Sequence, residues 1–495
     1  MAVSNYDGYR YEKAKRQING TRWAYDDEIH EKLSPVWLLD DHYSACGVPL
    51  ISNGYMAYVD DKDSHTLILG STGSKKTRLF AMPMMNIIAK AGESVICTDP
   101  KGELFERTSG LFAREGYKIL VINLREPLRS NGWNPLITAQ EYYRQGDNER
   151  AIALINDLAN TLFFANPGFK NDPFWQQTAS SVFSGLCAMM VENYRAFPKN
   201  VCNFATLRRL SENLTSPDGV GVGMTNQIAE CYPLSSVTRS NLNCVIAGSD
   251  RTFMNIMVSY NAPMQKLYAQ DSLIKMLAAP QIDFSSIGDE KTALYLIMPD
   301  EKTTLHGLVS LIIKQCYEAL IHSAQQREGK SLPVRVNFLL DEFANLPAIP
   351  DMNAMISAAR SRNIRFYLVV QAMHQLRGKY GEDAYTIRSN CNNWIFLTSR
   401  ELELLRELEA LCGVNQATGE ALISVSQLQR LSKDTGEALV LCDRNYPYIS
   451  HLADIDDYPF ASIPPIPLPE LPNKDTEVRV PDLNMLLGAV ERSLR

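Results

Sequence analysis

The segment HTLILGSTGSKKTRLF, residues 65–80, leads from a short apolar run through a loop rich in Gly and Ser into a helix-like stretch. Such a loop can hold phosphate, because its backbone N–H groups point inward, a lysine reaches the β- and γ-phosphates and a hydroxyl holds Mg²⁺. Lys76 and Thr77 match the lysine and the hydroxyl. The segment therefore predicts an ATP-binding loop, and the alternative is a plain turn between strand and helix. The predicted loop consists of Gly70, Ser71, Thr72, Gly73, Ser74, Lys75, Lys76 and Thr77.

One residue departs from the motif G-x-x-x-x-G-K-[ST], which has Gly where this sequence has Lys75. Gly is usual there because the backbone passes close to the phosphates and the dihedral angles suit Gly best. Lys75 fits without strain only if its φ is negative, and its ammonium then points into solvent or adds a second cation near the phosphates. A positive φ would distort the loop at a cost of about 1 kcal/mol or more. We expect a loop that binds nucleotide and turns it over slowly.

A second segment, VRVNFLLDEFANLP at residues 334–347, places Asp341 and Glu342 directly after an apolar run. Ligands of open α/β sheets bind at the carboxyl ends of parallel strands. An Asp at that edge can hold Mg²⁺, and an adjacent Glu can polarise the attacking water. We therefore predict that Asp341 and Thr77 hold the metal and that Glu342 is catalytic. The alternative is a helix N-cap followed by an acid in the first turn.

Further polar residues follow other apolar runs. Gln371 comes directly after RFYLVV and is predicted to sense the γ-phosphate or the water, with a plain surface residue as the alternative. Arg360, Arg362 and Arg365 form either a solvated face or the source of an arginine that reaches a neighbouring subunit's nucleotide. The sequence DPKGE, residues 99–103, is either a tight turn or a further part of the nucleotide site.

Short apolar runs separated by helical patterns must position these residues. Several of the runs are apolar on both faces, which is typical of buried parallel strands. Helical patterns at 78–91, 305–325 and 353–362 lie between them, so we predict an α/β fold with a mainly parallel sheet. The predicted strands cover residues 65–69, 94–98, 118–123, 293–298, 334–340, 365–370, 394–398 and 438–442.

The strand signals stop between residues 140 and 285, where helical patterns follow one another at 148–163, 174–194 and 204–214. We predict an all-α domain, 140–285, inserted into a nucleotide-binding domain formed by 46–139 and 286–457. Residues 1–45 are a lead-in. Residues 458–495 form a strap containing ASIPPIPLPELP and a short C-terminal helix with an apolar face of Leu483, Leu486, Leu487, Val490 and Leu494.

Composition excludes disordered, collagenous and fibrous proteins. The 495 residues include 45% hydrophobic and 21% charged residues, which is ordinary for a globular protein of two or three domains. The 49 Lys and Arg residues against 56 Asp and Glu residues give a net charge of −7, so any contact with DNA must be a local patch. Ten scattered cysteines without zinc or redox spacing indicate reduced thiols in the cytosol.

Taken together, these stretches resemble the type IV coupling proteins, the TraG/TraD-type ATPases of conjugation and type IV secretion. The resemblance covers roughly residues 20 to 455 in the family's order, and the combination is more specific than any single piece. It is carried by GTRWAYDDEI (20–29), HTLILGSTGSKKT, CTDPKGELFE, GYKILVINL, WNPL (133–136), NDPFW (171–175), DFSSIGDEKTALYLIMPDE, FLLDEFANLPAIP, ISAARSRNIRFYLVVQAMHQLRGKYG and IRSNCNNWIFLTSRELELLRELEALCG.

The resemblance implies a RecA-like domain with an all-α insertion, assembled as a homo-hexamer with ATP sites between subunits. Lys76 and Thr77 would be the Walker A pair, and Asp341 and Glu342 the Walker B pair. Arg360 falls where the family places a subunit-crossing arginine. The implied cofactors are ATP and Mg²⁺. The implied partners are single-stranded DNA bound without sequence preference, a relaxase or secreted protein cargo, and components of the secretion channel.

Family members carry membrane-spanning helices just ahead of the stretch matching GTRWAYDDEI, where this sequence has about twenty polar residues. Either an anchor has been removed or the chain is a naturally soluble member, so we expect a cytoplasmic protein that is largely monomeric in isolation. The predicted function is a DNA-translocating coupling ATPase. Its alternatives are a catalytically weak platform that recruits cargo and a soluble DNA-processing ATPase outside secretion.

Overall fold

The computed structural model describes residues 21–164, 173–214, 221–246, 250–301, 303–415, 418–460, 462–472, 474, 475, 477, 478, 480, 485, 488, 490 and 492. The chain forms two compact units. The first consists of residues 1–91, 339–344 and 365–462, and the second of residues 92–338, 345–364 and 463–495. The predicted domain boundaries differ from these units and stay a prediction.

The first unit contains strands that lie in the order β12 (Tyr448–His451), β11 (Glu437–Cys442), β10 (Cys391–Phe396), β4 (His65–Leu69) and β9 (Ile364–Val370). β4 pairs in parallel with both β10 and β9, whereas β11 pairs antiparallel with β10 and β12. Every residue of β4 and β9 is buried, as the apolar runs predict. The loops that follow β4 and β9 therefore begin at the same edge.

Short elements complete this unit, and the sequence predicted one of them, the helix that covers residues 82–91. A small antiparallel sheet has the order β1 (Ser34–Trp37), β3 (Met56–Val59) and β2 (Pro49–Ser52). Its strands have four residues each, too few for a clear alternation of apolar and polar residues. The helices of the unit are α2 (Asp26–Lys32), α3 (Met82–Ala91), α15 (Met373–Tyr380), α16 (Asp383–Ser389), α17 (Leu402–Cys412) and α18 (Val425–Leu428).

In the second unit, β7 (Thr292–Ile297) lies between β5 (Ser94–Asp99) and β6 (Lys118–Asn123), and both pairings are parallel. Helix α4 (Glu103–Arg114) packs against β5 and β6. β8 (Val336–Leu340) begins in this unit and ends in the first, and the unit also holds α13 (His306–Gln325) and α14 (Met352–Ala359). All strands expected from the apolar runs thus form, with ends that shift by a few residues.

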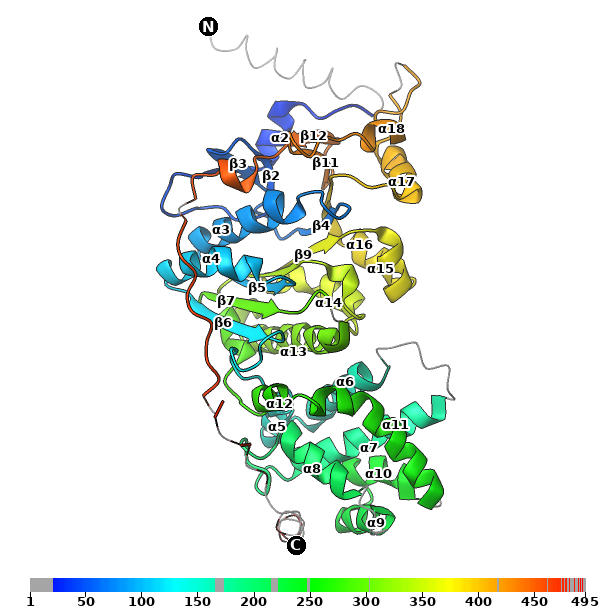
Figure 1. Ribbon diagram of the computed structural model, residues 1–495. Coiled ribbons are helices and arrows are strands. Elements are labelled where there is room, and N and C mark those ends of the chain that lie inside the picture. Colours follow the sequence, from blue (N-terminus) through cyan, green and yellow to red (C-terminus); the bar gives the residue numbers. More distant parts are fainter. Residues whose placement is uncertain are drawn as a thin grey trace. The chain divides into compact units, whose positions relative to one another are not determined.

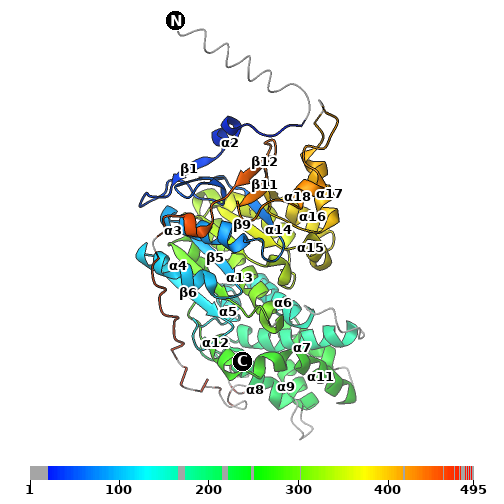
Figure 2. The same ribbon diagram turned by 45° about the horizontal axis from the view of Figure 1, so that its top comes forward.

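Helices follow one another between β6 and β7 in the part of the chain that the structure describes. Figures 1 and 2 show α6, α7 and α11 side by side, and α7 contacts α6 and α11 as well as α10. The periodic apolar residues of α6 face this bundle, and α7 is buried along most of its length. The helices are α5 (Ile137–Arg144), α6 (Asn148–Phe164), α7 (Pro173–Glu192), α8 (Phe204–Leu214), α9 (Gly221–Cys231), α10 (Val237–Ile246), α11 (Asp250–Tyr268) and α12 (Asp271–Leu277).

The Pro-rich segment runs along the second unit. Gly110 of α4 permits this close approach, because a Cβ there would lie 2.1 Å from the carbonyl oxygen of Pro464. The N–H of Leu471 donates to the carbonyl of Leu128 at 3.0 Å. Most of the predicted apolar face of the C-terminal helix, Leu483, Leu486, Leu487 and Leu494, lies outside the described residues. Within the described ranges, no helix has the length and apolar character required to cross a bilayer.

Candidate functional site

The predicted phosphate loop begins at the carboxyl end of β4. The N–H of Gly70 donates to the carbonyl of Val370 at 3.2 Å, and the N–H of Ser71 donates to that of Thr398 at 2.9 Å. Gly73 takes a positive φ of 78°, which turns the loop back toward the helix. The helix opens with a π-helical turn, Thr77–Ala81, and continues as α3. Buried Leu79 and Phe80 anchor this turn in the core.

Lys76 points back across the loop. Its Nζ donates to the carbonyl oxygen of Gly70 at 2.5 Å and to that of Ser71 at 3.0 Å. Burial lowers the pKa of Lys76, and the negative charges of Asp341 and Glu342 oppose this shift. The structure therefore holds a lysine ammonium on the loop, partly withdrawn from water and within electrostatic reach of the acidic pair.

The acidic pair follows β8, whose residues are all buried. Asp341 is buried, and its Oδ1 accepts from the N–H of Glu342 at 2.9 Å. Glu342 has a φ of 52°, which is uncommon for a residue with a side chain and characteristic of functional sites. Both residues belong to the unit that holds the loop.

Gln371 connects the loop to the acidic pair. Thr72 Oγ1 donates to Gln371 Oε1 at 3.2 Å, and Gln371 Nε2 donates to Glu342 Oε1 at 3.4 Å. A side-chain amide can do both because it carries one acceptor oxygen and one donor nitrogen. The structure thus gathers the loop, Asp341, Glu342 and Gln371, which lie far apart in the sequence, at one sheet edge.

Lys75 adopts the strained alternative. Its φ is 64°, which is the positive of the two signs that the sequence left open. Its ammonium points away from the loop interior and forms an ion pair with Asp454 Oδ2 at 3.2 Å. Arg78 binds the same carboxylate and also Asp456. Arg78, followed by Lys75, lowers the pKa of Asp454 to about 2.

Neither Asp454 nor Arg78 was recognised from the sequence. The sequence offers only the signal that two cations, Lys75 and Arg78, lie three residues apart. No acidic residue occurs between Ser64 and Gly92 to partner them. Asp454 lies 379 residues after Lys75, and nothing in its local sequence marks it as that partner.

The loop fits a nucleotide phosphate with Mg²⁺. Lys76 supplies a positive charge inside the loop, where its ammonium is bonded to the carbonyl oxygens of Gly70 and Ser71. Ser74 Oγ is buried and has no hydrogen-bond partner among the residues that the structure describes, so an additional acceptor or donor can be bound there. The hydroxyl of Thr77 and the carboxylate of Asp341 are the hard oxygen ligands that Mg²⁺ prefers.

The arginines after α14 differ in environment. Arg360 is exposed and belongs to the second unit, in the turn Arg360–Arg362. Arg365 is 1% exposed, and its guanidinium donates to the carbonyl of Cys46 at 2.8 Å, so it supports the fold from inside. Its burial removes Arg365 from the residues able to reach a neighbouring subunit.

The DPKGE segment forms a turn and a helix start. Asp99 is buried, and its Oδ2 accepts from the N–H of Phe105 in the first turn of α4 at 2.8 Å. Gly102 adopts a φ of 77°, which closes the turn. These contacts favour the tight-turn interpretation over a role in the nucleotide site.

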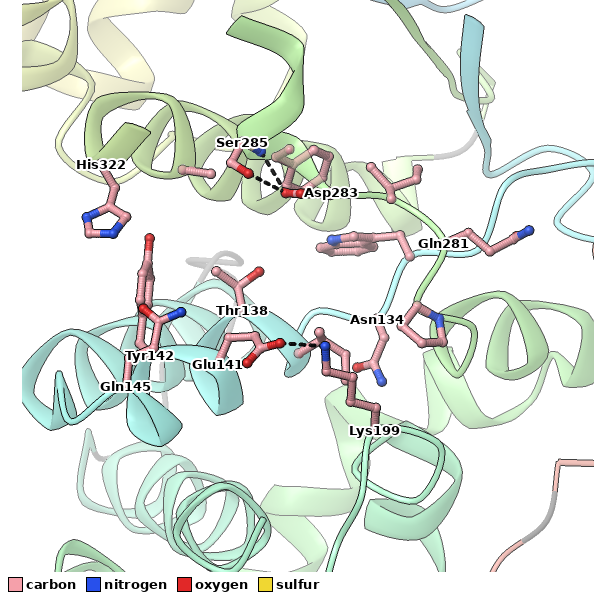
Figure 3. A pocket seen from close by; sticks show the side chains of 16 residues that line it. Asn134, Thr138, Glu141, Tyr142, Gln145, Lys199, Gln281, Asp283, Ser285 and His322 are labelled. Carbon is pink, nitrogen blue, oxygen red and sulfur yellow. Dashed lines mark hydrogen bonds and ion pairs between the residues drawn. The ribbon is translucent and has the colours of Figure 1, made fainter. Parts of the chain in front are cut away.

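A separate pocket of about 400 Å³ lies in the second unit, and none of the predicted site residues line it. Figure 3 shows Lys199 reaching toward Glu141, an ion pair of 2.5 Å. Across the pocket, Asp283 accepts from Ser285 N at 2.9 Å and from Ser285 Oγ at 2.6 Å. Lys199 and Glu141 are therefore engaged with each other, and Asp283 is engaged with Ser285.

Comparison with known proteins gives consistent results. The family described as Type IV secretory system Conjugative DNA transfer matches residues 15–434. The chain is 24% identical over 482 residues to the conjugal transfer protein TraG of Escherichia coli, which covers 90% of this chain and 71% of TraG. It is 26% identical over 367 residues to the protein VirD4 of Rhizobium radiobacter, covering 72% of this chain and 49% of VirD4. The chain thus spans about half to about 70% of these relatives.

Solved structures of the plasmid coupling protein TrwB have the same fold. One, in complex with the ATP analogue ADPNP, is 14% identical with a TM-score of 0.56 and covers 92% of this chain and 97% of its own. Another holds ADP and Mg²⁺, with a TM-score of 0.55. The predicted fold class, a RecA-like P-loop fold with a mainly parallel sheet and an all-α insertion, is therefore confirmed.

Proposed function

Because this chain belongs to the type IV secretory system conjugative DNA transfer family, as its resemblance predicted, we propose that it is a DNA-translocating coupling ATPase. It delivers a relaxase with its DNA, or a protein cargo, to a secretion channel. The single observation that carries the ATPase proposal is Gln371, which bonds to Thr72 of the loop and to Glu342 of the acidic pair. This contact supports one site in which the loop and the acid act on the same substrate.

The residues divide the work of hydrolysis as follows. Lys76 exchanges its two carbonyl acceptors for phosphate oxygens and neutralises charge that develops on the transferred group. Glu342 polarises the water for in-line attack on the γ-phosphate, and Gln371 holds Glu342 in register with the loop. Thr77 and Asp341 hold Mg²⁺, which supplies positive charge to the phosphate oxygens.

Assembly and DNA binding extend this proposal. Arg360 is exposed, so its guanidinium is accessible to a neighbouring subunit, as a homo-hexamer with shared ATP sites requires. In a ring, a few Lys and Arg side chains directed into the channel are enough to track a single strand while the net charge stays at −7. The strand is bound through its phosphates and without sequence preference.

A second candidate function is favoured by Lys75. A lysine with a φ of 64° in a phosphate loop is compatible with a platform that binds nucleotide and recruits cargo without rapid turnover. The two functions differ in one measurable quantity, the rate of ATP hydrolysis in the presence of DNA.

Two variants test the site. We expect Lys76→Ala to lose both nucleotide binding and hydrolysis, because the charge that faces the phosphates is gone. We expect Glu342→Gln to keep nucleotide affinity and to lose about 100-fold or more in turnover, the contribution of a general base. Glu382→Gln, an exposed glutamate in the same unit, is the matched control and leaves both quantities unchanged. Equal turnover in Glu342→Gln and the parent protein would contradict the assignment of Glu342 as the residue that polarises the water.

A further inference from the structure

The segment that follows β12 meets the outer side of the phosphate loop. Asp454 accepts at Oδ2 from Lys75 Nζ at 3.2 Å and from Arg78 Nε at 3.2 Å, and a second nitrogen of Arg78 binds Oδ1. One carboxylate thus holds two cations, one from the phosphate loop and one from the first turn of the helix that follows it. Its side chain is 21% exposed, so these ion pairs are partly shielded from water.

Asp454 is held in place by contacts that do not involve the loop. The N–H of Ala453 donates to Ser52 Oγ at 2.9 Å, and the hydroxyl of Tyr458 reaches the same oxygen at 2.7 Å. The carboxylate also accepts from the N–H of Asp456 at 3.4 Å, which caps the short 3-10 turn Ile455–Asp457. The acid is therefore a fixed point against which the loop can be positioned.

Lys75 depends on this fixed point more than Arg78 does. Arg78 also binds Asp456, whereas Lys75 has no second ion-pair partner within the described parts of the chain. Lys75 has a φ of 64°, a conformation that a lysine keeps only when its surroundings hold it. Without the carboxylate, the positive charges of Lys75 and Arg78, which both lie beside it, would also repel each other.

We propose that Asp454 is a positioning residue of the nucleotide site, which holds Lys75 in its left-handed conformation through their ion pair and so keeps the phosphate loop in its binding shape. Asp454 makes no contact with the nucleotide in this scheme and acts through Lys75. The inference deepens the proposed function and rests on it, because the ligand of the loop is taken to be a nucleotide.

The substitution Asp454→Asn separates this role from simple support of the fold. Asn is as good a cap as Asp, so the 3-10 turn and the docking of residues 453–458 are kept while the charge is removed. Asp456→Asn is the matched control, because Asp456 lies two residues away, binds Arg78 and makes no contact with Lys75. Lys75→Gly removes both the ion pair and the need to hold a strained side chain.

The experiment measures two quantities on the parent protein, Asp454→Asn, Asp456→Asn, Lys75→Gly and the double variant. The first is affinity for a fluorescent N-methylanthraniloyl ADP with Mg²⁺, and the second is hydrogen exchange of a peptide covering residues 70–79 without nucleotide. We expect Asp454→Asn to weaken affinity and to speed exchange about three- to tenfold, the effect of one partly buried ion pair. In the Lys75→Gly background the same change has an effect of less than about twofold.

The outcomes distinguish failure of the positioning role of Asp454 from failure of the proposed function. An equal loss from Asp454→Asn in both backgrounds, or an equal loss from Asp456→Asn, assigns Asp454 to general support of the fold and overturns the inference. No change in affinity or exchange also overturns it. If the parent protein binds no nucleotide, the proposed function fails, and the exchange measurement still decides whether Asp454 orders the loop.

Discussion

Replacing Lys75 with Gly tests the part of the site where this chain departs from the phosphate-loop motif. The left-handed conformation of Lys75, with a φ of 64°, costs about 1 kcal/mol that Gly does not have to meet. Two effects of the substitution destabilise the folded protein and oppose this gain. Loss of the ion pair with Asp454 costs about 0.2–1 kcal/mol, and the larger unfolded-state entropy of Gly costs about 0.4–1 kcal/mol. The free energy of unfolding should therefore change by less than about 1 kcal/mol.

Turnover should respond more than stability. If the strain disfavours the geometry in which Lys76 meets the phosphates, its relief raises the ATPase rate by at most about fivefold, since 1.36 kcal/mol corresponds to tenfold. The assay compares steady-state hydrolysis of ATP with Mg²⁺ and single-stranded DNA for the parent protein and Lys75→Gly. Thermal unfolding of the same samples checks that stability is unchanged.

Two further variants identify the cause of any increase. Lys75→Ala removes the ion pair but keeps the Cβ, so it should stay as slow as the parent protein or become slower. Lys330→Gly relieves a second lysine of positive φ, 51°, in the other unit, and should leave the rate unchanged. A Lys75→Gly protein no faster than its parent would refute the reasoning and show that the lysine is harmless to turnover.

Three other predictions concern assembly, pH and DNA. Arg360→Ala should lower turnover about tenfold or more while nucleotide binding changes little. The specific activity of the parent protein should rise with protein concentration or added DNA. Full activity throughout a dilution series would contradict an ATP site shared between subunits. Burial lowers the pKa of Lys76, whereas a bound phosphate favours its charged form, so nucleotide binding takes up a proton. The affinity for ADP should therefore fall as the pH rises through that lowered pKa, by at most about tenfold per pH unit. Titrations across the alkaline range measure this slope, with Lys76→Arg as a variant that stays charged. Affinity for single-stranded oligonucleotides should fall steeply with salt, and the logarithm of the binding constant should fall by about 0.7 per contacted phosphate for each tenfold rise in salt concentration. Equal binding at two salt concentrations would argue that the protein does not bind the strand through its phosphates.

Sequence reasoning predicted that the parts of the candidate site meet because each of them follows a buried strand. Gly70 follows β4, Asp341 follows β8 and Gln371 follows β9. Apolar runs identify such strands well, and the rule that ligands meet the carboxyl ends of parallel strands then places the three residues at one edge.

The contacts that hold the loop could not be found in the same way. Asp454 lies in a stretch with three other acids, Asp456, Asp457 and Glu470, within sixteen residues, and local sequence does not distinguish among them. What selects Asp454 is the docking of its neighbours on Ser52, a contact that spans about 400 residues. Long-range pairing of this kind depends on the folded chain and leaves no periodic signal.

The conformations of Lys75 and Glu342 show why local preference fails most at the site itself. Among the described residues other than Gly, positive φ occurs at Lys75, Lys330, Glu342, Asp351, Asn363 and Asp443. Asn and Asp tolerate this conformation, because their short side chains bond to the nearby backbone, whereas Lys and Glu do not. Two of the three residues for which it is costly therefore belong to the phosphate loop and the acidic pair. Two contacts offset part of this cost, the ion pair of Asp454 with Lys75 and the hydrogen bond of Gln371 with Glu342. A site built in this way gains a defined geometry at the expense of local stability, so its weakest points under mutation should be the partners that hold the strain and not only the residues that meet the phosphates.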